Sequence, residues 1–107
     1  MPSPRPLEIL ELDAVRTLLA AGEVVVAAGG GGIPVVRSER GFDGIDAVID
    51  KDHASALLAT GLGAERLVIL TQVPGVYRQL PKSDEPGDPI AELRPDRDAA
   101  LVDELPA

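Results

Sequence analysis

The sequence has no cysteine and no tryptophan, and it contains one phenylalanine, one tyrosine and one histidine among 107 residues. Without cysteine, neither disulfide bonds nor thiolate chemistry is available. Hydrophobic residues make up 45% of the chain. With so few aromatic side chains, any core must be built from Val, Leu, Ile and Ala. A chain of this length forms at most one small domain with a modest core.

Positive charge is also scarce, since ten Lys and Arg stand against eighteen Asp and Glu and leave a net charge of −8. An acidic chain repels phosphate backbones, so a nucleic-acid partner is not expected. No apolar run approaches the roughly 20 residues that a membrane-spanning helix needs. The first ten residues, MPSPRPLEIL, lack the apolar centre of a signal peptide. We therefore expect a cytoplasmic protein with no membrane contact.

Apolar residues recur at helical spacing in two stretches. The first predicts a helix over residues 12–19, with Asp13 favouring its start and Gly22 its end. The second predicts a helix that starts near Asp52 and ends at glycines after residue 60. A further short helix is predicted for residues 96–105, entered through a proline.

Short apolar runs between these stretches predict strands, because β-branched residues favour buried extended segments. The expected strands or extended segments are residues 24–26, 34–36, 45–49, 67–70 and 90–93. Residues 38–44 predict a turn or small hairpin, and residues 81–89 a loop. Alternation of helix and strand predicts an α/β fold with a largely parallel sheet.

Four consecutive glycines, Gly29, Gly30, Gly31 and Gly32, follow the valine run. Glycine permits positive φ and lets backbone N–H groups approach an oxyanion closely. A flexible turn between strands accounts for the run equally well. A P-loop requires Gly-Lys-Ser/Thr, but here Ile33 follows the last glycine. A dinucleotide fingerprint requires a helix after the glycines, whereas proline and valines follow here.

A lysine between two aspartates, Asp50-Lys51-Asp52, lies at the expected start of the second helix. A helix N-terminus favours anions, and lysine supplies a compact positive charge for phosphate. The plainer interpretation is an exposed Lys51 with Asp52 as the helix N-cap. The adjacent His53 has no evident acid–base partner and is interpreted as structural, with no metal site.

In this order, the segments GGGGIPVV, VIDKD and LTQVPGVY resemble the amino acid kinase family, and within it carbamate kinases most closely. The resemblance implies a three-layer α/β/α fold, of which residues 1–107 form a partial domain on the nucleotide side. It also implies reversible transfer of a phosphoryl group between ATP and carbamate, in arginine metabolism. ATP or ADP with Mg²⁺ would be the co-substrate, without a tightly bound cofactor, and the full-length family is commonly homodimeric.

The resemblance assigns a role to each motif. It places Gly29 to Gly32 near the small acid and the transferred phosphoryl group. It gives Lys51 contact with phosphoryl oxygens, and Asp52 the orientation of the catalytic lysines. It places Thr71 and Tyr77 near the adenine and ribose, although Tyr77 also fits a core position in an aromatic-poor domain.

The chain departs from the family pattern at three positions. Ala28 replaces a small hydroxyl or thiol residue, Gln72 an acid found in many relatives, and Pro74 an acid common in carbamate kinases. The first change removes one hydrogen-bonding group from the glycine loop. The second loosens the contacts expected with ribose.

Several parts of the family pattern are absent. The sequence lacks an A-L-G-G-N-A-type loop and a G-S-M-G-P-K segment, and its lysines are Lys51 and Lys82. Phosphoryl transfer depends on several preorganised charges, so this polypeptide alone is expected not to be a competent kinase. The alternative function is a noncatalytic nucleotide-binding or interaction module that needs a partner chain.

Overall fold

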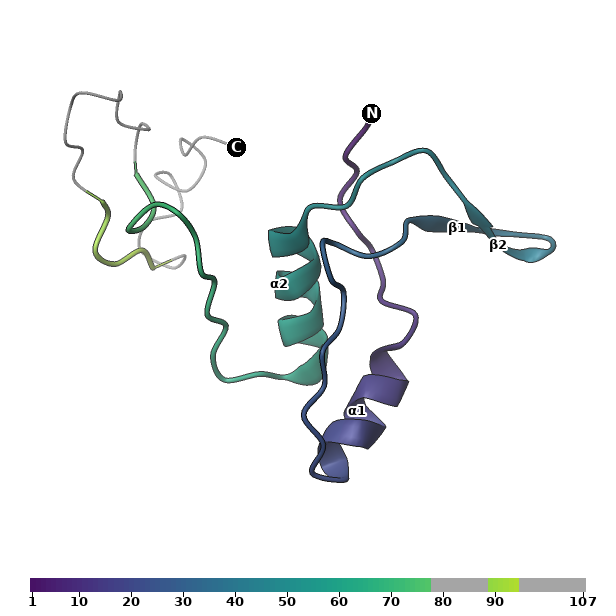
Figure 1. Cartoon of the computed structure of the whole chain (residues 1–107), viewed down its shortest axis with the longest axis horizontal. Coiled ribbons are helices and arrows are strands. Elements are labelled where there is room, and N and C mark those ends of the chain that lie inside the picture. Colours follow the sequence, from purple (N-terminus) through teal and green to yellow (C-terminus); the bar gives the residue numbers. More distant parts are fainter. Residues whose placement is uncertain (78–88, 95–107) are drawn as a thin grey trace. The chain divides into compact units, whose positions relative to one another are not determined.

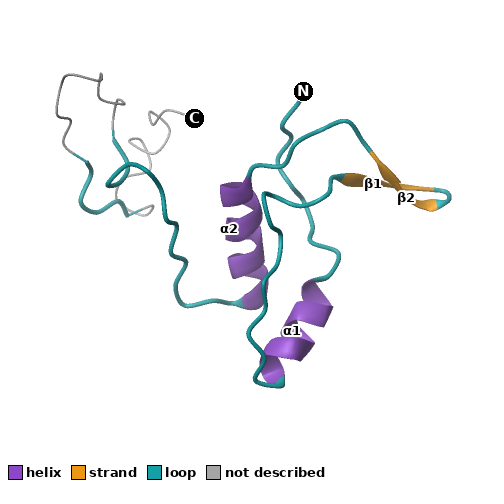
Figure 2. Ribbon diagram, viewed as in Figure 1, coloured by secondary structure: helices purple, strands orange, loops and turns teal. Residues whose placement is uncertain are grey.

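The computed structural model describes residues 1–77 and 89–94. The chain divides into two compact units, residues 1–69 and 70–107. The regular elements of the described residues all lie in the first unit (Figures 1 and 2). In chain order they are helix α1 (Leu12–Ala20), strands β1 (Val35–Ser38) and β2 (Gly41–Gly44), and helix α2 (Lys51–Leu62).

Helix α1 confirms the first predicted helix. Asp13 lies in its first turn, where a carboxylate interacts favourably with the helix dipole. The helix ends as predicted at Gly22, whose φ of 86° is left-handed. The amides of Gly22 and Glu23 donate to the carbonyls of Leu19 and Leu18, each at 3.0 Å. This pairing is a Schellman motif, which satisfies carbonyls that the end of a helix leaves free.

Helix α2 confirms the second predicted helix but corrects its cap. The N-cap residue is Asp50, whose carboxylate accepts from the amide of Asp52 at 2.8 Å and that of His53 at 3.2 Å. Asp52 lies in the first turn and is not the cap. At the other end Gly63 adopts a φ of 66°, and the amide of Ala64 donates to the carbonyl of Ala59 at 2.9 Å. Both helices therefore end in the same glycine-dependent way.

Strands β1 and β2 form the hairpin that the polar stretch 38–44 predicts. They pair antiparallel, with Val35 opposite Gly44 and Ser38 opposite Gly41. The guanidinium of Arg37 lies 5.2 Å from the ring centre of Phe42, the residue opposite it. Within the described residues this pair is the whole of the regular sheet.

The other predicted strands are not regular strands in the described residues. Segments 24–26, 45–49 and 67–70 carry no ladder, and residues 90–93 contribute one isolated antiparallel bridge between Val76 and Ile90. A strand is stabilised by hydrogen bonds to a neighbour, so an apolar segment without a neighbour does not become one. The predicted helix 96–105 and nearly all of the loop 81–89 lie outside the described residues.

Helices α1 and α2 contact each other, and Val15 of α1 and Ala54 of α2 are the buried hydrophobic residues of the first unit. Arg16 of α1 donates to the carbonyl of Gly61 near the end of α2. The side chain of Leu12 packs against Gly61. A Cβ at position 61 would lie 2.8 Å from the Leu12 Cδ2 atom, so a larger residue there would displace this side chain. None of the helices in the described ranges is long and apolar enough to cross a membrane.

Candidate functional site

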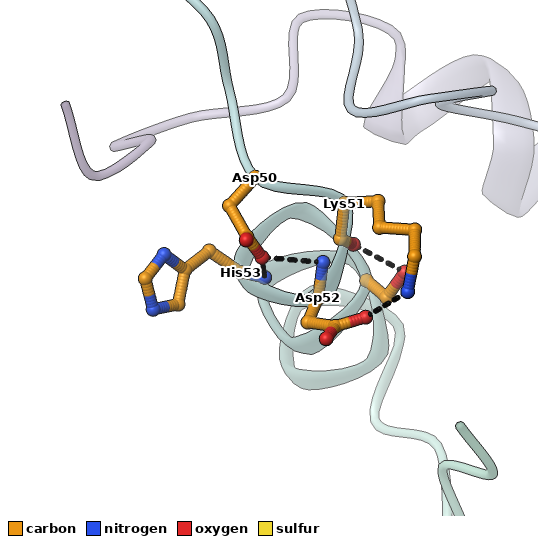
Figure 3. A network of polar contacts seen from close by, with 5 residues as sticks. Asp50, Lys51, Asp52 and His53 are labelled. Atoms are coloured by element: carbon orange, nitrogen blue, oxygen red, sulfur yellow. Dashed lines mark hydrogen bonds and ion pairs between the residues drawn. The ribbon is translucent and has the colours of Figure 1, made fainter. Parts of the chain in front are cut away.

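The start of α2 gathers the charged groups of the Asp50-Lys51-Asp52 motif (Figure 3). The Nζ atom of Lys51 lies 2.6 Å from Oδ1 of Asp52, and both side chains are about half exposed. The hydroxyl of Ser55 donates to the carbonyl of Lys51 at 2.7 Å. An ammonium has three donors, so pairing with Asp52 leaves Lys51 with further donors that an anion can accept from.

The charges of this cluster are stabilised by their neighbours. Hydrogen bonds from the backbone amides of His53 and Asp52 lower the pKa of Asp50 below 3.8. The hydrogen bond and charge of Asp52 raise the pKa of Lys51 above 10.5. Both groups are therefore charged at neutral pH. Because Asp50 already occupies two of the first amides of α2, a bound anion at this end depends on Lys51 and on the adjacent glycine loop.

The glycine loop, Gly29 to Gly32, adopts backbone angles that residues with a Cβ rarely adopt. The φ angles of Gly29, Gly31 and Gly32 are 50°, 141° and 102°. Short turns close the loop, with the amide of Gly29 donating to Ala27 at 2.8 Å and that of Gly31 to Ala28 at 2.9 Å. Ala28 has a φ of 66°. Among the residues that the structure describes, it is the non-glycine residue with a left-handed backbone conformation. The sequence indicated only that Ala28 lacks the hydroxyl or thiol group of the family pattern, and residue type alone does not reveal its backbone conformation.

Gly31 brings the glycine loop against the residues that lead into α2. It is buried, and a Cβ on it would lie 1.9 Å from the carbonyl oxygen of Ile49 and 3.5 Å from the backbone nitrogen of Lys51. Only glycine fits so close to another backbone. The structure thus places two motifs predicted separately, the glycine run and the Asp-Lys-Asp triplet, beside each other.

The predicted nucleotide residues lie in the second unit. Thr71 is exposed, whereas Tyr77 is 7% exposed, next to the bridge between Val76 and Ile90. This burial favours a packing role for the Tyr77 ring. The nucleotide-binding roles of both residues stay predictions.

His53 takes part in the cluster through its backbone. Its amide donates to Asp50, while its imidazole points away from Lys51 (Figure 3). The described residues contain no group of three His, Cys, Asp or Glu side chains that could hold a metal ion. The interpretation of His53 as structural, with no metal site, stays a prediction.

A cavity of about 540 Å³ lies in the first unit beside the glycine loop. Apolar residues of α1, α2 and the segment between them line it, among them Val15, Leu18, Val25, Ile49, Ala54 and Leu58. This cavity was not predicted from the sequence. Helical spacing predicts which residues share one face of each helix, but it does not reveal that a cavity lies beside these faces.

Comparison with known proteins agrees with the family resemblance of the sequence motifs. The chain matches the profile of the amino acid kinase family over residues 2–104. It is 53% identical over 85 residues to a carbamate kinase of Staphylococcus haemolyticus, covering 79% of this chain and 28% of that one. It is 40% identical over 102 residues to a carbamate kinase of Halobacterium salinarum, covering 95% and 33%.

Solved structures agree with the sequence relatives. A structure of Giardia carbamate kinase superposes with a TM-score of 0.76 at 41% identity, covering 96% of this chain and 33% of that chain. The chain thus spans about a third of the length of the relatives it matches. The elements described above are those of an incomplete α/β fold.

Proposed function

This chain belongs to the amino acid kinase family, and from that membership we propose that it is the phosphoryl-facing portion of a carbamate kinase-type phosphotransferase. The reaction is ATP plus carbamate to ADP plus carbamoyl phosphate, and it is reversible. The observation that carries the proposal is the contact of Gly31 with the backbone at Ile49, which places the glycine loop beside Lys51.

This arrangement is suited to a group that gains negative charge. During phosphoryl transfer the oxygens of the transferred group carry charge that positive groups and N–H donors stabilise. Lys51 supplies the positive charge, and Asp52 fixes its ammonium at 2.6 Å. The backbone amides of Gly30 and Gly32, which donate to no other main-chain group in the described residues, are available to an oxyanion.

The remaining parts of the proposal follow from the family. The co-substrate is ATP or ADP with Mg²⁺, which is held mainly by the nucleotide phosphates. Thr71 and Tyr77 of the second unit are proposed to bind the nucleotide. The proposed setting is cytoplasmic arginine metabolism, with a homodimer as the assembly of the full-length protein. One catalytic lysine does not supply the charge that the reaction needs, so the chain alone is proposed to be inactive.

Two assays of ATP formation from ADP and carbamoyl phosphate test the proposal. The isolated chain is expected to give no more ATP than a reaction without protein. A chimera of Giardia carbamate kinase, in which this chain replaces the matching third, is expected to be active. Lys51→Met in the chimera should lower kcat by about a hundredfold or more, as loss of a preorganised charge does.

Lys82→Met is the matched control, because it removes the chain's other lysine, which lies outside the described residues. It should leave kcat within about twofold of the parent chimera. An active chimera that is insensitive to Lys51→Met refutes the role of Lys51. Turnover by the isolated chain refutes the proposed inactivity.

A further inference from the structure

A strained three-residue turn leads into the glycine loop. The amide of Gly29 donates to the carbonyl of Ala27 at 2.8 Å, around Ala28, whose φ is 66°. This hydrogen bond, with a positive φ at the central residue, defines the form of γ-turn that is rare and strained. Asp46 is the centre of a turn with the same hydrogen bond, at 3.0 Å, but its φ is not positive, so that turn is the common inverse form. An alanine in the conformation of Ala28 carries a cost that glycine does not.

The contact of Gly31 with Ile49 holds the strained turn from its far side. The carbonyl of Ala28 accepts from the amide of Gly31 at 2.9 Å. Gly31 is buried, and a Cβ on it would lie 1.9 Å from the carbonyl oxygen of Ile49. Strained backbone persists where the surrounding structure fixes it, and such residues cluster at ligand-binding sites. The strain at Ala28 is therefore maintained by the same loop that faces the phosphoryl group in the proposed function.

The γ-turn occupies a donor that an oxyanion can use. Gly29, Gly30 and Gly32 are all exposed. Across residues 1–77 and 89–94, the amides of Gly30 and Gly32 donate to no main-chain group, whereas that of Gly29 donates to Ala27. A hydrogen bond to an anion is roughly twice as strong as one to a neutral carbonyl. Transfer of the Gly29 amide from the carbonyl to an anion therefore gains a stronger hydrogen bond and lets Ala28 return to a negative φ.

We propose that Ala28 is a positioning residue, which keeps the Gly29 amide bonded to Ala27 until a phosphoryl oxyanion binds the glycine loop. The anion then accepts from this amide, the γ-turn opens, and Ala28 relaxes to a negative φ. Part of the binding free energy comes from the strain that is released, so a variant without the strain binds the anion less tightly. The inference rests on the proposed phosphoryl role of the glycine loop, and it adds a donor and a source of binding free energy to that role.

Nuclear magnetic resonance of the full chain, with inorganic phosphate as the probe, follows the turn directly. A hydrogen bond transmits a scalar coupling from the Ala27 carbonyl carbon to the Gly29 nitrogen. This coupling should be present in the free chain and absent at saturating phosphate. The amide signals of the three exposed glycines should shift together along the titration, since one anion accepts from all three. The corresponding coupling across the inverse turn at Asp46 is the internal control and should persist.

Ala28→Gly removes the strain and only a methyl group. It should raise the urea midpoint of the free chain yet weaken phosphate binding by about five- to thirtyfold, the range that the cost of a left-handed alanine sets. A residue with a structural role alone would not move stability and affinity in opposite directions. In the active chimera the same change should raise the KM for carbamoyl phosphate by a similar factor and leave the KM for ADP within about twofold.

Ala21→Gly is the matched control for the loss of a methyl group. Ala21 is exposed, has a φ of −81° and caps the end of α1, away from the glycine loop in sequence. This variant should change phosphate affinity by less than about twofold.

Three results would overturn the proposal. One is a coupling between Ala27 and Gly29 that persists at saturating phosphate, which would refute the opening of the turn and leave the proposed function intact. Another is equal phosphate affinity of Ala28→Gly and the parent chain. The third is a titration in which phosphate shifts none of the glycine amides. The proposed function fails by a separate result, an active chimera that is insensitive to Lys51→Met.

Discussion

Replacing Gly31 with alanine should break the contact that joins the glycine loop to α2. Two independent effects act on this single methyl group. The φ of Gly31 is 141°, a backbone conformation that residues with a Cβ rarely adopt. In addition, the new Cβ would lie 1.9 Å from the carbonyl oxygen of Ile49 and 2.9 Å from its carbonyl carbon. Both obstructing atoms belong to the backbone, so no side-chain rotation relieves the overlap.

The size of the effect follows from these two terms. Holding a residue with a Cβ in a glycine conformation costs about 1–3 kcal/mol. Forcing a methyl group into a filled space costs about 1–3 kcal/mol more. We expect Gly31→Ala to lower the free energy of unfolding by about 3 kcal/mol or more, a large part of the roughly 5 kcal/mol available to a small domain. With a urea dependence of about 1.5 kcal/mol per molar, the unfolding midpoint should fall by about 2 M.

Urea unfolding followed by far-UV circular dichroism measures this change, since α1 and α2 supply the helical signal. Gly30→Ala is the matched control, because its φ is not positive and a Cβ there would meet nothing within 4 Å. It should change the free energy of unfolding by less than about 1 kcal/mol. If the two variants unfold at the same urea concentration, the close approach of Gly31 to Ile49 is not a feature of the folded protein.

Changes at Asp50, Ala28 and Arg16 test other features of the first unit, and thermal or urea unfolding measures their effects. Asp50→Ala removes the N-cap of α2 and should lower the thermal midpoint by roughly 5 °C. The stabilisation from the lowered pKa of Asp50 is complete above pH 3.8 and is lost as pH falls through the lowered value, so Asp50→Asn should remove this pH dependence. Ala28→Gly relieves about 1–2 kcal/mol of strain from the left-handed backbone of the folded state. It also stabilises the unfolded state by about 0.4–1 kcal/mol through added chain entropy. The free energy of unfolding should therefore rise by about 0.5–1 kcal/mol. Ala27→Gly, whose φ is not positive, should instead destabilise the protein. Arg16→Met removes the hydrogen bond to Gly61 together with the exposed ion pair to Asp13, and should cost about 1 kcal/mol. An unchanged stability would show that this link between α1 and α2 contributes nothing.

Local features were predictable from the sequence because they depend on a few neighbouring residues. Helix spacing gave α1 and α2 to within one residue at their starts, and Gly22 and Gly63 marked their ends. The hairpin followed from the polar stretch 38–44 and its two glycines. The choice of cap was wrong because Asp50 and Asp52 both fit an N-cap by residue type. Only the backbone at Asp50, with a ψ of 128°, decides between them.

Strands were predicted less well for a physical reason. The valine run has the composition of a buried parallel strand, but composition specifies a side-chain environment and not the neighbour that provides hydrogen bonds. The predicted sheet therefore belongs to the whole family fold, of which this chain matches about a third. The closeness of the glycine loop to Lys51 was implied by the resemblance alone. No residue spacing would have revealed that Gly31 contacts the backbone of Ile49.

The contact between Gly31 and Ile49 joins backbone to backbone over a separation of 18 positions and requires no sheet. The pairing of Lys51 with Asp52 and the cap at Asp50 are more local still. The placement of the glycine loop beside Lys51 is therefore built from contacts that a third of the fold already contains. Residues 24–26, in contrast, pair with no strand in the part of the chain that the structure describes. The position of Lys51 is thus set by contacts within this chain, at Gly31, Asp50 and Asp52.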